Sequence, residues 1–453
     1  MKPRKITIAS ASLSAALLVS MSAALSVGGR IASANQVRST AAASLPKAPA
    51  DPWASQDKKY KGQTITYYGG SVGSDHLADV PLVAAFEKST GIKIKIVEQP
   101  STGDAALAQL ERTFSQGSSS IDVTRIDVVW PGTLGKYLLP LAKPLAADKK
   151  LEIKSILKND TVGGKLVAMP YQGDFGMLYY RPSLLKKYGY SKPPTTWAQL
   201  GTMAKKIQAG EQKTNKNFYG FVFQGKSYEG LTCDALEWLA SSGGGTYLTH
   251  SGKVTIDNAK AAAMLKLVQS WVGTISPKGV TAYDEGATQN AWTAGDAAFA
   301  RNWPYMDSPA ILKGSKVAND TAVAPLPHGP GGKSVATVGG WQIAVSKFTK
   351  HAGAAEAWAR YYASKPVQIW RATYAGIVPT MPSVDTVASV KKAQPFLATV
   401  ANQTGRVTRP TILGGNYAKG SADIYQGINS ILTGGNVSST LSIIQKELQA
   451  LNP

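Results

Sequence analysis

Acidic and aromatic residues recur where a predicted strand gives way to a glycine or proline turn. The acidic residues are Asp75, Asp127 and Asp174, and the aromatic residues are Trp303, Tyr305 and Trp341. A sugar ring has an apolar face of C–H groups and an edge of hydroxyls, so a site for it combines aromatic planes with hydrogen-bonding groups. An aromatic plane contributes ~0.5–1.5 kcal/mol beyond the area it buries, and a hydrogen bond to a charged group contributes ~1.5–3 kcal/mol. The recurrence of these residue types at turns predicts a carbohydrate site.

The same residues are compatible with two alternatives. An isolated tryptophan beside a proline is more often part of a core, and an isolated aspartate at a strand end is more often a cap or a turn. Two carboxylates also suffice for glycoside hydrolysis when they lie ~5–9.5 Å apart, a separation that a sequence does not give. A secreted glycoside hydrolase is therefore the alternative function.

No grouping typical of a metal or cofactor site occurs. The four histidines are far apart, and neither an H-E-x-x-H motif nor a paired-cysteine spacing is found. The glycine-rich turn at residues 69–75 lacks the G-x-G-x-x-G spacing of a dinucleotide site. Cys233 is the only cysteine, so an intramolecular disulfide is excluded, and we expect this residue to pack as a small apolar side chain. We expect no metal, no cofactor and no catalytic residue.

The elements that would position the candidate residues alternate between strands and helices. Residues 65–68 are expected to form a strand, residues 78–89 a helix that ends at Gly91, and residues 92–96 a second strand. The turn at 69–75 follows the first strand at its carboxyl end, where open α/β sheets bind ligands. This alternation predicts the α/β class.

Four further segments matter for the site. A strand over 121–130 carries Asp127, and a strand over 336–346 carries Gly339-Gly340-Trp341. The stretch 164–181 lies between two α/β patterns and is expected to cross from one half of the molecule to the other. We expect Tyr228 and Glu229 in a loop.

Two pairs of residues have the spacing of helix caps. Thr196 and Gln199 stand three residues apart at the start of an apolar helical stripe, and we interpret them as a capping box. Asp234 and Glu237 have the same spacing and are given the same interpretation.

Composition and charge indicate a folded protein without a nucleic-acid partner. The 453 residues are 43% hydrophobic, which suffices for two or three cores and excludes disorder as the main state. Lys and Arg number 49 against 28 Asp and Glu, a net charge of +21, but they are scattered along the chain instead of clustered. This charge fits a basic surface that faces an anionic cell envelope, or an acidic exterior in which few carboxylates are kept.

The N-terminus predicts export. A basic start is followed by an uncharged run over residues 6–29 and by Ala32-Ser33-Ala34, a small-x-small cleavage pattern. Residues 1–34 are thus predicted to be a signal peptide or, because the run exceeds the usual ~7–15 residues, a membrane anchor. Residues 35–62 have the composition of a flexible linker. We expect the protein outside the cytoplasm, in the periplasm or at the cell surface.

Several long segments resemble the trehalose/maltose-binding proteins of the extracellular solute-binding family that feed ABC importers. The resemblance covers nearly everything from residue 63 to the C-terminus. Its most specific segments are IDVVWPG from Ile126, GKLVAMP from Gly164, MLYYRPSLLKKYGY from Met177, NFYGFVFQGKSYEGLTCDALEWLAS from Asn217, RNWPY from Arg301 and GGWQIAVS from Gly339.

This resemblance implies a two-lobed periplasmic-binding-protein fold of type II, with discontinuous lobes joined by a hinge. The N-terminal lobe would comprise residues 63–168 and 338–378, and the C-terminal lobe residues 169–337 and 379–453. It further implies a monomer that captures an α-linked disaccharide of the trehalose or maltose type and presents it to the permease subunits of an ABC transporter.

Residue by residue, the resemblance implies that Asp127 and Asp174 bind sugar hydroxyls and that Trp303 and Tyr305 contact the rings. It also implies that Gly340 and Trp341 contribute from a crossing strand, and that Arg409 matches an arginine that reaches the ligand.

Two positions depart from the family pattern, and both bear on which sugar is bound. Asp75 stands where relatives usually have the longer glutamate, and Gln172 stands where tyrosine or phenylalanine is common. A third function, a peptide- or wall-binding module on the same fold, is compatible with the same architecture.

Overall fold

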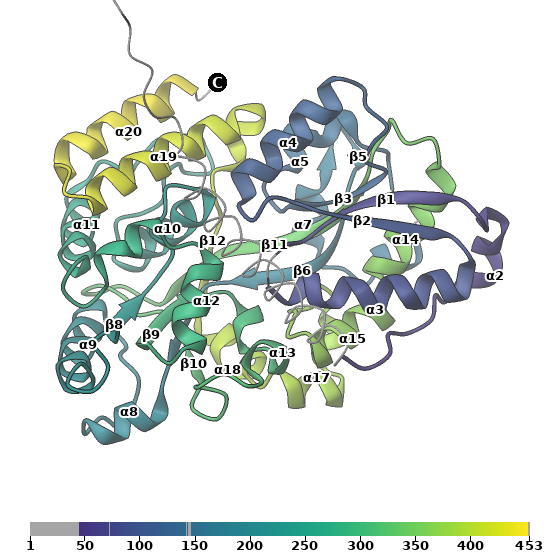
Figure 1. Cartoon of the computed structure of the whole chain (residues 1–453). Coiled ribbons are helices and arrows are strands. Elements are labelled where there is room, and N and C mark those ends of the chain that lie inside the picture. The colour runs from purple at the N-terminus through teal and green to yellow at the C-terminus, as the bar shows by residue number, and fades with distance from the viewer. Residues whose placement is uncertain (1–44, 72, 142, 144–145, 452–453) are drawn as a thin grey trace, which may run out of the picture.

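The computed structural model describes residues 45–71, 73–141, 143 and 146–451, which form two α/β lobes side by side (Figure 1). The first sheet has the order β12-β11-β3-β1-β2, with β6 also paired to β11. Its strands are β1 (Thr64–Gly69), β2 (Lys93–Glu98), β3 (Val123–Asp127), β6 (Met169–Phe175), β11 (Val335–Val345) and β12 (Gly405–Val407). The second sheet has the order β10-β7-β9-β8. Its strands are β7 (Met177–Tyr180), β8 (Tyr219–Val222), β9 (Ala297–Asn302) and β10 (Ala322–Ala324), and β4 (Thr161–Val162) and β5 (Lys165–Leu166) form a separate hairpin.

The first sheet begins with the β-α-β unit that the sequence predicts. Strands β1 and β2 are parallel, and α3 (Gly73–Thr90) connects them and ends before Gly91, whose φ is 79°. Apolar residues of α3 face the core, where the ring centroid of Phe86 lies 5.1 Å from that of Trp358. The predicted strand, helix and strand are confirmed, and the helix starts five residues earlier than expected.

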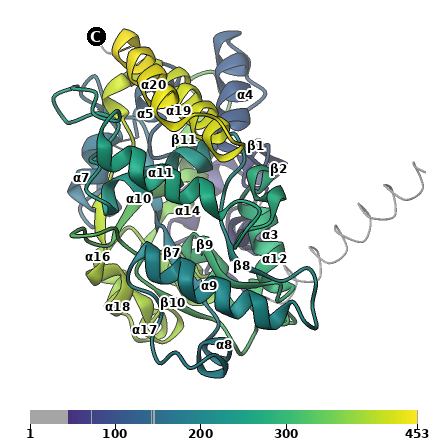
Figure 2. The same cartoon turned by 90° about the vertical axis from the view of Figure 1, so that its left-hand side faces the viewer.

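Further helices accompany the first sheet. They are α2 (Ala54–Asp57), α4 (Gly103–Ser115), α5 (Pro131–Leu134), α6 (Ala146–Lys149), α7 (Lys154–Asn159), α14 (Ala352–Ala363), α15 (Lys365–Tyr374), α16 (Pro382–Asp385) and α17 (Ala388–Ala393). The second sheet is accompanied by α8 (Pro182–Lys187), α9 (Trp197–Glu211), α10 (Glu229–Ser241), α11 (Ala259–Trp271), α12 (Glu285–Thr293), α13 (Pro309–Leu312), α18 (Phe396–Gln403), α19 (Tyr417–Leu432) and α20 (Val437–Leu451). Helices α19 and α20 cover one end of this second lobe, above α10 and α11 (Figure 2).

Two strands carry the chain between the lobes. Strand β6 belongs to the first sheet and continues through Gly176 into β7 of the second, so the crossover predicted for residues 164–181 is confirmed. Strand β11 pairs with β3 of the first sheet through residues 341–345, and near its other end the backbone N–H of Thr337 donates to Glu237 on α10 of the second lobe at 3.1 Å. The predicted lobe boundaries at 168/169 and 337/338 fall at the start of β6 and within β11, and the division into lobe segments stays a prediction.

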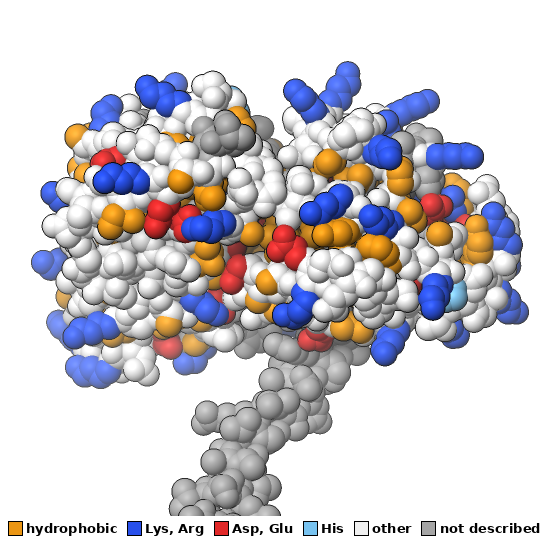
Figure 3. Space-filling model, turned by 90° about the horizontal axis from the view of Figure 1, so that it is seen from above, with side chains coloured by type: hydrophobic (Ala, Val, Ile, Leu, Met, Phe, Trp, Pro, Cys, Tyr) orange, Lys and Arg blue, Asp and Glu red, His pale blue; other side chains and the backbone are white. Residues whose placement is uncertain are grey.

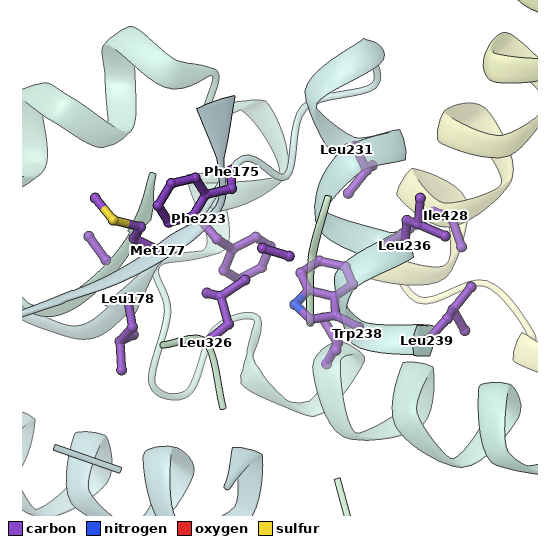
Figure 4. Packing of buried hydrophobic residues seen from close by; sticks show 14 of the residues in the cluster. Phe175, Met177, Leu178, Phe223, Leu231, Leu236, Trp238, Leu239, Leu326 and Ile428 are labelled. Carbon is purple, nitrogen blue, oxygen red and sulfur yellow. The ribbon is translucent and has the colours of Figure 1, made fainter. Parts of the chain in front are cut away.

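The apolar core of the second lobe starts at the crossing strand. Phe175, Met177 and Leu178 pack into the same buried cluster as residues of α10 and β8. Figure 4 shows this core around Phe223 and Trp238, whose rings meet edge to face with centroids 5.4 Å apart. Buried apolar area contributes ~25 cal/mol per Å², so this packing holds the end of the crossing strand in place.

The linker prediction for residues 35–62 is wrong for residues 45–62. This segment contains α2 and a 3-10 turn at Lys58–Tyr60, and Asp57 receives two hydrogen bonds of 2.6 and 2.7 Å from the Arg360 guanidinium. The hydroxyl of Tyr361 donates to the carbonyl of Pro49 at 2.7 Å. Because a few specific contacts and not a periodic apolar face hold this segment, its composition resembles that of a linker. The predicted signal or anchor at 1–34 and the linker residues 35–44 lie outside the described residues.

Among the helices of the described residues, none is both long and apolar enough to cross a membrane.

Gly340 is required where the two crossing strands meet. Its φ is 135°, and a Cβ atom there would lie 2.4 Å from the carbonyl oxygen of Gln172. We expect Gly340→Ala to lower the free energy of unfolding by ~3 kcal/mol or more, because a strained backbone and a backbone clash add up. Gly314→Ala is the matched control: φ is 77° and no atom lies within 4 Å of the added Cβ, so only ~1–2 kcal/mol is expected. Urea unfolding measures the free energy of unfolding of both variants, and an equal loss in the two would contradict the clash at Gly340.

Buried carboxyl groups in the first lobe predict that the fold is more stable in acid. Burial raises the pKa of Asp79 to about 7, against an opposing effect of Arg371, and raises the pKa of Glu152 to about 8. Since the same groups titrate near pH 4 in an unfolded chain, the folded state holds more protons between about pH 4 and 8. The free energy of unfolding therefore falls as the pH rises through that window.

We expect the melting temperature to be higher at pH 5 than at pH 8, measured by differential scanning calorimetry. Glu152→Gln should reduce this difference, whereas Glu98→Gln, at a side chain that is 46% exposed, should not. A stability maximum near neutral pH with early unfolding in acid would contradict the expectation, and with it the idea of an acidic exterior.

Candidate functional site

A cavity opens between the lobes at the crossing strands. The space between its walls, counted together with the open mouth, is about 890 Å³. All nine residues predicted from the sequence lie in its wall: Asp75, Asp127, Gln172, Asp174, Trp303, Tyr305, Gly340, Trp341 and Arg409. The turn after β1, the ends of β3 and β9, and the crossing strands β6 and β11 thus meet at one place.

The first wall is built around a buried ion pair that the sequence did not indicate. Asp75 lies in the first turn of α3, and its Oδ2 accepts a hydrogen bond of 2.7 Å from Nη1 of Arg125. Both side chains are 6% exposed. A Cβ atom at Gly70 would lie 2.2 Å from that Nη1, so the glycine-rich turn makes room for the guanidinium.

Arg125 also covers one face of Trp341. The guanidinium carbon lies 3.4 Å from the ring centroid, a cation–π contact that is worth ~2 kcal/mol when desolvated. The edge of the ring meets Trp130, at 5.7 Å between centroids and an interplanar angle of 88°. Trp341 therefore has one ring face already occupied by the protein.

Arg409 connects the two lobes across the cavity. Its Nη2 and Nη1 donate to the two carboxylate oxygens of Asp127 at 2.6 and 3.1 Å, and Nη1 also donates to Glu229 at 2.7 Å. Asp127 ends β3 of the first lobe, whereas Glu229 opens α10 of the second. Tyr417 donates to the same oxygen of Glu229, Oε1, and Ser421 donates to Oε2. Both terminal nitrogens of Arg409 are thus bound to protein, and Nε has no partner among the described residues.

The position of Glu229 corrects one prediction. Tyr228 and Glu229 are not in a loop, because Glu229 is the first residue of α10 and Tyr228 is its N-cap. A carboxylate is stabilised in the first turn of a helix by the unpaired N–H groups there.

Gln172 and Asp174 face the cavity from β6. They lie two residues apart, and Nε2 of Gln172 donates to Oδ2 of Asp174 at 2.8 Å. Oε1 of Gln172 and Oδ1 of Asp174 are buried and have no partner among the described residues. Burial, reinforced by the negative charge of Asp75, raises the pKa of Asp174 to about 8, and Gln172 and Arg125 oppose this rise.

Trp303 and Tyr305 form the aromatic side of the cavity. They follow β9 in the turn Trp303-Pro304-Tyr305, and Nε1 of Trp303 donates to Glu285 at 3.3 Å. Glycines allow close approach on both rings: a Cβ atom at Gly339 would lie 3.0 Å from Trp303, and one at Gly73 would lie 3.1 Å from Tyr305. The two rings are therefore held by the crossing strand and by the start of α3.

A buried cluster of charged side chains packs against the ring of Trp303. The guanidinium carbon of Arg301 lies 4.0 Å from the Trp303 ring centroid, and its Nε and Nη2 donate to Glu237 at 2.8 and 2.7 Å. Asp234 pairs with the same guanidinium at 3.0 Å. The capping-box interpretation of Asp234 and Glu237 is therefore wrong. They lie inside α10, where a spacing of three residues puts both on one face, toward Arg301.

Sequence reasoning missed three charged residues of the wall, Arg125, Glu229 and Glu285. Arg125 stands two residues before Asp127 on one strand, so the period of two of a strand puts both on the same face, a signal that was available. Glu285 has no such signal, because it opens α12 far from the other residues in the chain.

Comparisons with known proteins agree with this architecture. Residues 54–369 match the model of the bacterial extracellular solute-binding protein family. A probable ABC transporter-binding protein of Deinococcus radiodurans is 45% identical over 373 residues, which are 82% of this chain and 89% of the relative.

Two further relatives bind maltose or maltodextrin. The maltose-bound structure of MalE3 from T. maritima is 33% identical with a TM-score of 0.79, and the match covers 86% of this chain and 100% of that structure. The maltodextrin-binding protein MdxE of Bacillus subtilis is 28% identical over 295 residues, 62% of this chain and 64% of the relative. The chain therefore belongs to the bacterial extracellular solute-binding protein family, the solute-binding components of ABC transporters, and has their two-lobed type II fold.

Proposed function

We propose that this protein captures an α-linked disaccharide of the trehalose or maltose type outside the cytoplasm and delivers it to an ABC transporter. The observation that carries the proposal is the composition of the cavity wall. It combines two aromatic rings, Trp303 and Tyr305, with hydrogen-bonding oxygens that have no partner among the described residues. This is the combination that a sugar ring with its hydroxyl edge requires. The maltose-bound relative supports the choice of sugar.

Hinge closure is the proposed mechanism of capture. The cavity wall draws on both lobes, so a ligand that contacts both has more contacts in the closed form and shifts the equilibrium toward it. Arg409 acts in the same direction, since it can bind Asp127 and Glu229 at the same time only while the lobes are together. The closed protein, as a monomer, would then be the form that the permease subunits recognise.

The proposal is tested by titration calorimetry with trehalose, maltose, sucrose, palatinose, glucose and a short-peptide mixture. We expect saturable heat with trehalose or maltose and none with peptides. Binding of peptides alone would favour a peptide- or wall-binding module. Incubation with the same disaccharides tests the glycoside hydrolase alternative. Release of glucose in proportion to the amount of protein would favour a hydrolase and contradict the transport function.

Trp303 supplies a second test. We expect Trp303→Ala to weaken disaccharide binding at least about tenfold, that is by ~1.4 kcal/mol, because an aromatic plane and its buried area are lost. Titration calorimetry measures the affinity, and circular dichroism with thermal melting checks the fold. Tyr374→Ala, at an aromatic residue that is 39% exposed and outside the cavity wall, is the control and should bind normally. Unchanged affinity in Trp303→Ala would remove this ring from the site.

A further inference from the structure

The cavity is acidic although the protein is strongly basic. Its wall contains five carboxylate side chains, Asp75, Asp127, Asp174, Glu229 and Glu285, and two arginines, Arg125 and Arg409, in a chain whose net charge is +21. Seen from above, Lys and Arg side chains stand around both lobes, while acidic side chains also lie where the lobes meet (Figure 3). The cavity wall and the outer surface therefore differ in the sign of their charged side chains.

The ion pairs of the wall leave some of its carboxyl groups without a cation. Asp75 is paired with Arg125, and Asp127 and Glu229 share the single charge of Arg409. Asp174 and Glu285 have no ion-pair partner within the described part of the chain. Glu285 nevertheless accepts hydrogen bonds from Tyr228 and from Trp303. From the described part of the chain, Asp174 receives the bond from Gln172 and no other.

Four buried oxygens of this wall have no hydrogen-bond partner among the described residues. One is Oγ of Ser71, which can donate as well as accept. The other three are acceptors: Oδ1 of Asp75, Oε1 of Gln172 and Oδ1 of Asp174. Asp75 and Gln172 are each 5% exposed. A buried acceptor left unpaired costs ~1–3 kcal/mol, so three of them in the wall of one cavity indicate that a bound group satisfies them.

The number and kind of these oxygens indicate which chemical group of a ligand would bind there. A sugar hydroxyl donates one hydrogen bond, whereas a protonated amine donates three and accepts none. Its positive charge would also stabilise the ionised form of Asp174, in which both carboxylate oxygens accept hydrogen bonds. We propose that the wall formed by Asp75, Gln172 and Asp174 binds the ammonium of an amino sugar, a disaccharide in which one hydroxyl is replaced by a protonated amine. This inference rests on the proposed sugar-binding function and names a narrower ligand class for the same site.

Proton release is a separate consequence of this arrangement. Asp174 faces the carboxylates of Asp75 and Asp127 and the guanidinium of Arg125, and its pKa is raised to about 8 by burial and by Asp75. An ammonium beside it favours the ionised carboxylate and lowers that pKa. Below pH 8, binding of the amine therefore transfers a proton from Asp174 to solvent, whereas binding of a neutral sugar does not require this.

The test is titration calorimetry of the full-length protein at pH 6.5. The probes are trehalose and maltose, their 2-, 4- and 6-amino derivatives, and the N-acetylated form of each amine, which keeps the substituent but removes the charge. We expect at least one amine to bind at least about tenfold more tightly than its parent sugar and its acetylated form. Repeating the titration in buffers of different ionisation enthalpy should show net proton release for that amine only.

Variants connect the effect to the proposed residue. Asp174→Asn keeps the shape of the side chain and removes its charge, so the preference for amine over parent sugar should fall at least about fivefold and the proton release should disappear. Asp307→Asn removes a carboxyl two residues from Tyr305 that is not in the cavity wall, and the preference should stay. If Asp174→Asn does not fold, the proton release measured with the unaltered protein still tests the inference.

Other results separate this inference from the proposed function. Binding of neutral disaccharides with no gain from any amine would overturn the inference and leave the proposed function intact. Binding of putrescine, an amine without a sugar ring, in the absence of any sugar binding would overturn both.

Discussion

Strand β11 is hydrogen-bonded to both halves of the molecule, and the cavity depends on that constraint. Its C-terminal part pairs with β3 and β6 of the first sheet. Near its N-terminal end, the backbone N–H of Thr337 donates to Glu237 and the Thr337 hydroxyl donates to the carbonyl of Cys233, both on α10 of the second lobe. Between these regions, Gly339 leaves room for the Trp303 ring and Gly340 for the backbone of β6, and Trp341 receives Arg125 on its face. Three consecutive residues thus set the distance between the aromatic side and the charged side of the site.

Three arginines organise the charges around this strand, each in a different way. Arg125 stays within the first lobe, Arg301 stays within the second, and Arg409 joins the two. Each is almost fully buried, where a charge is stable only with close partners. Opening of the lobes would separate Arg409 from Asp127. The energy of that separation opposes opening, and a ligand that contacts both walls adds to it.

The sequence predicts the residues of the site better than it predicts their partners. Asp75, Asp127 and Trp303 are recognisable because turn position and residue type are local features, and the resemblance supplies Gln172 and Arg409. The pairing of Arg125 with Asp75 spans 50 residues and that of Arg301 with Glu237 spans 64, and no local pattern encodes such distances. For the same reason the local pattern indicates caps at Asp234 and Glu237 and a linker at residues 45–62, whose partners Arg301 and Arg360 lie far along the chain.

The burial of the single cysteine has a consequence for how the protein withstands oxidising conditions. A lone accessible thiol in an oxidising environment can form a disulfide with a second copy of the chain or with a small thiol. Cys233 lies at the cavity wall on α10 and is 2% exposed, and burial raises the pKa of its thiol well above the usual range. Since the thiolate is the reactive form, the protein keeps a sulfur atom in its core without exposing it to covalent dimerisation.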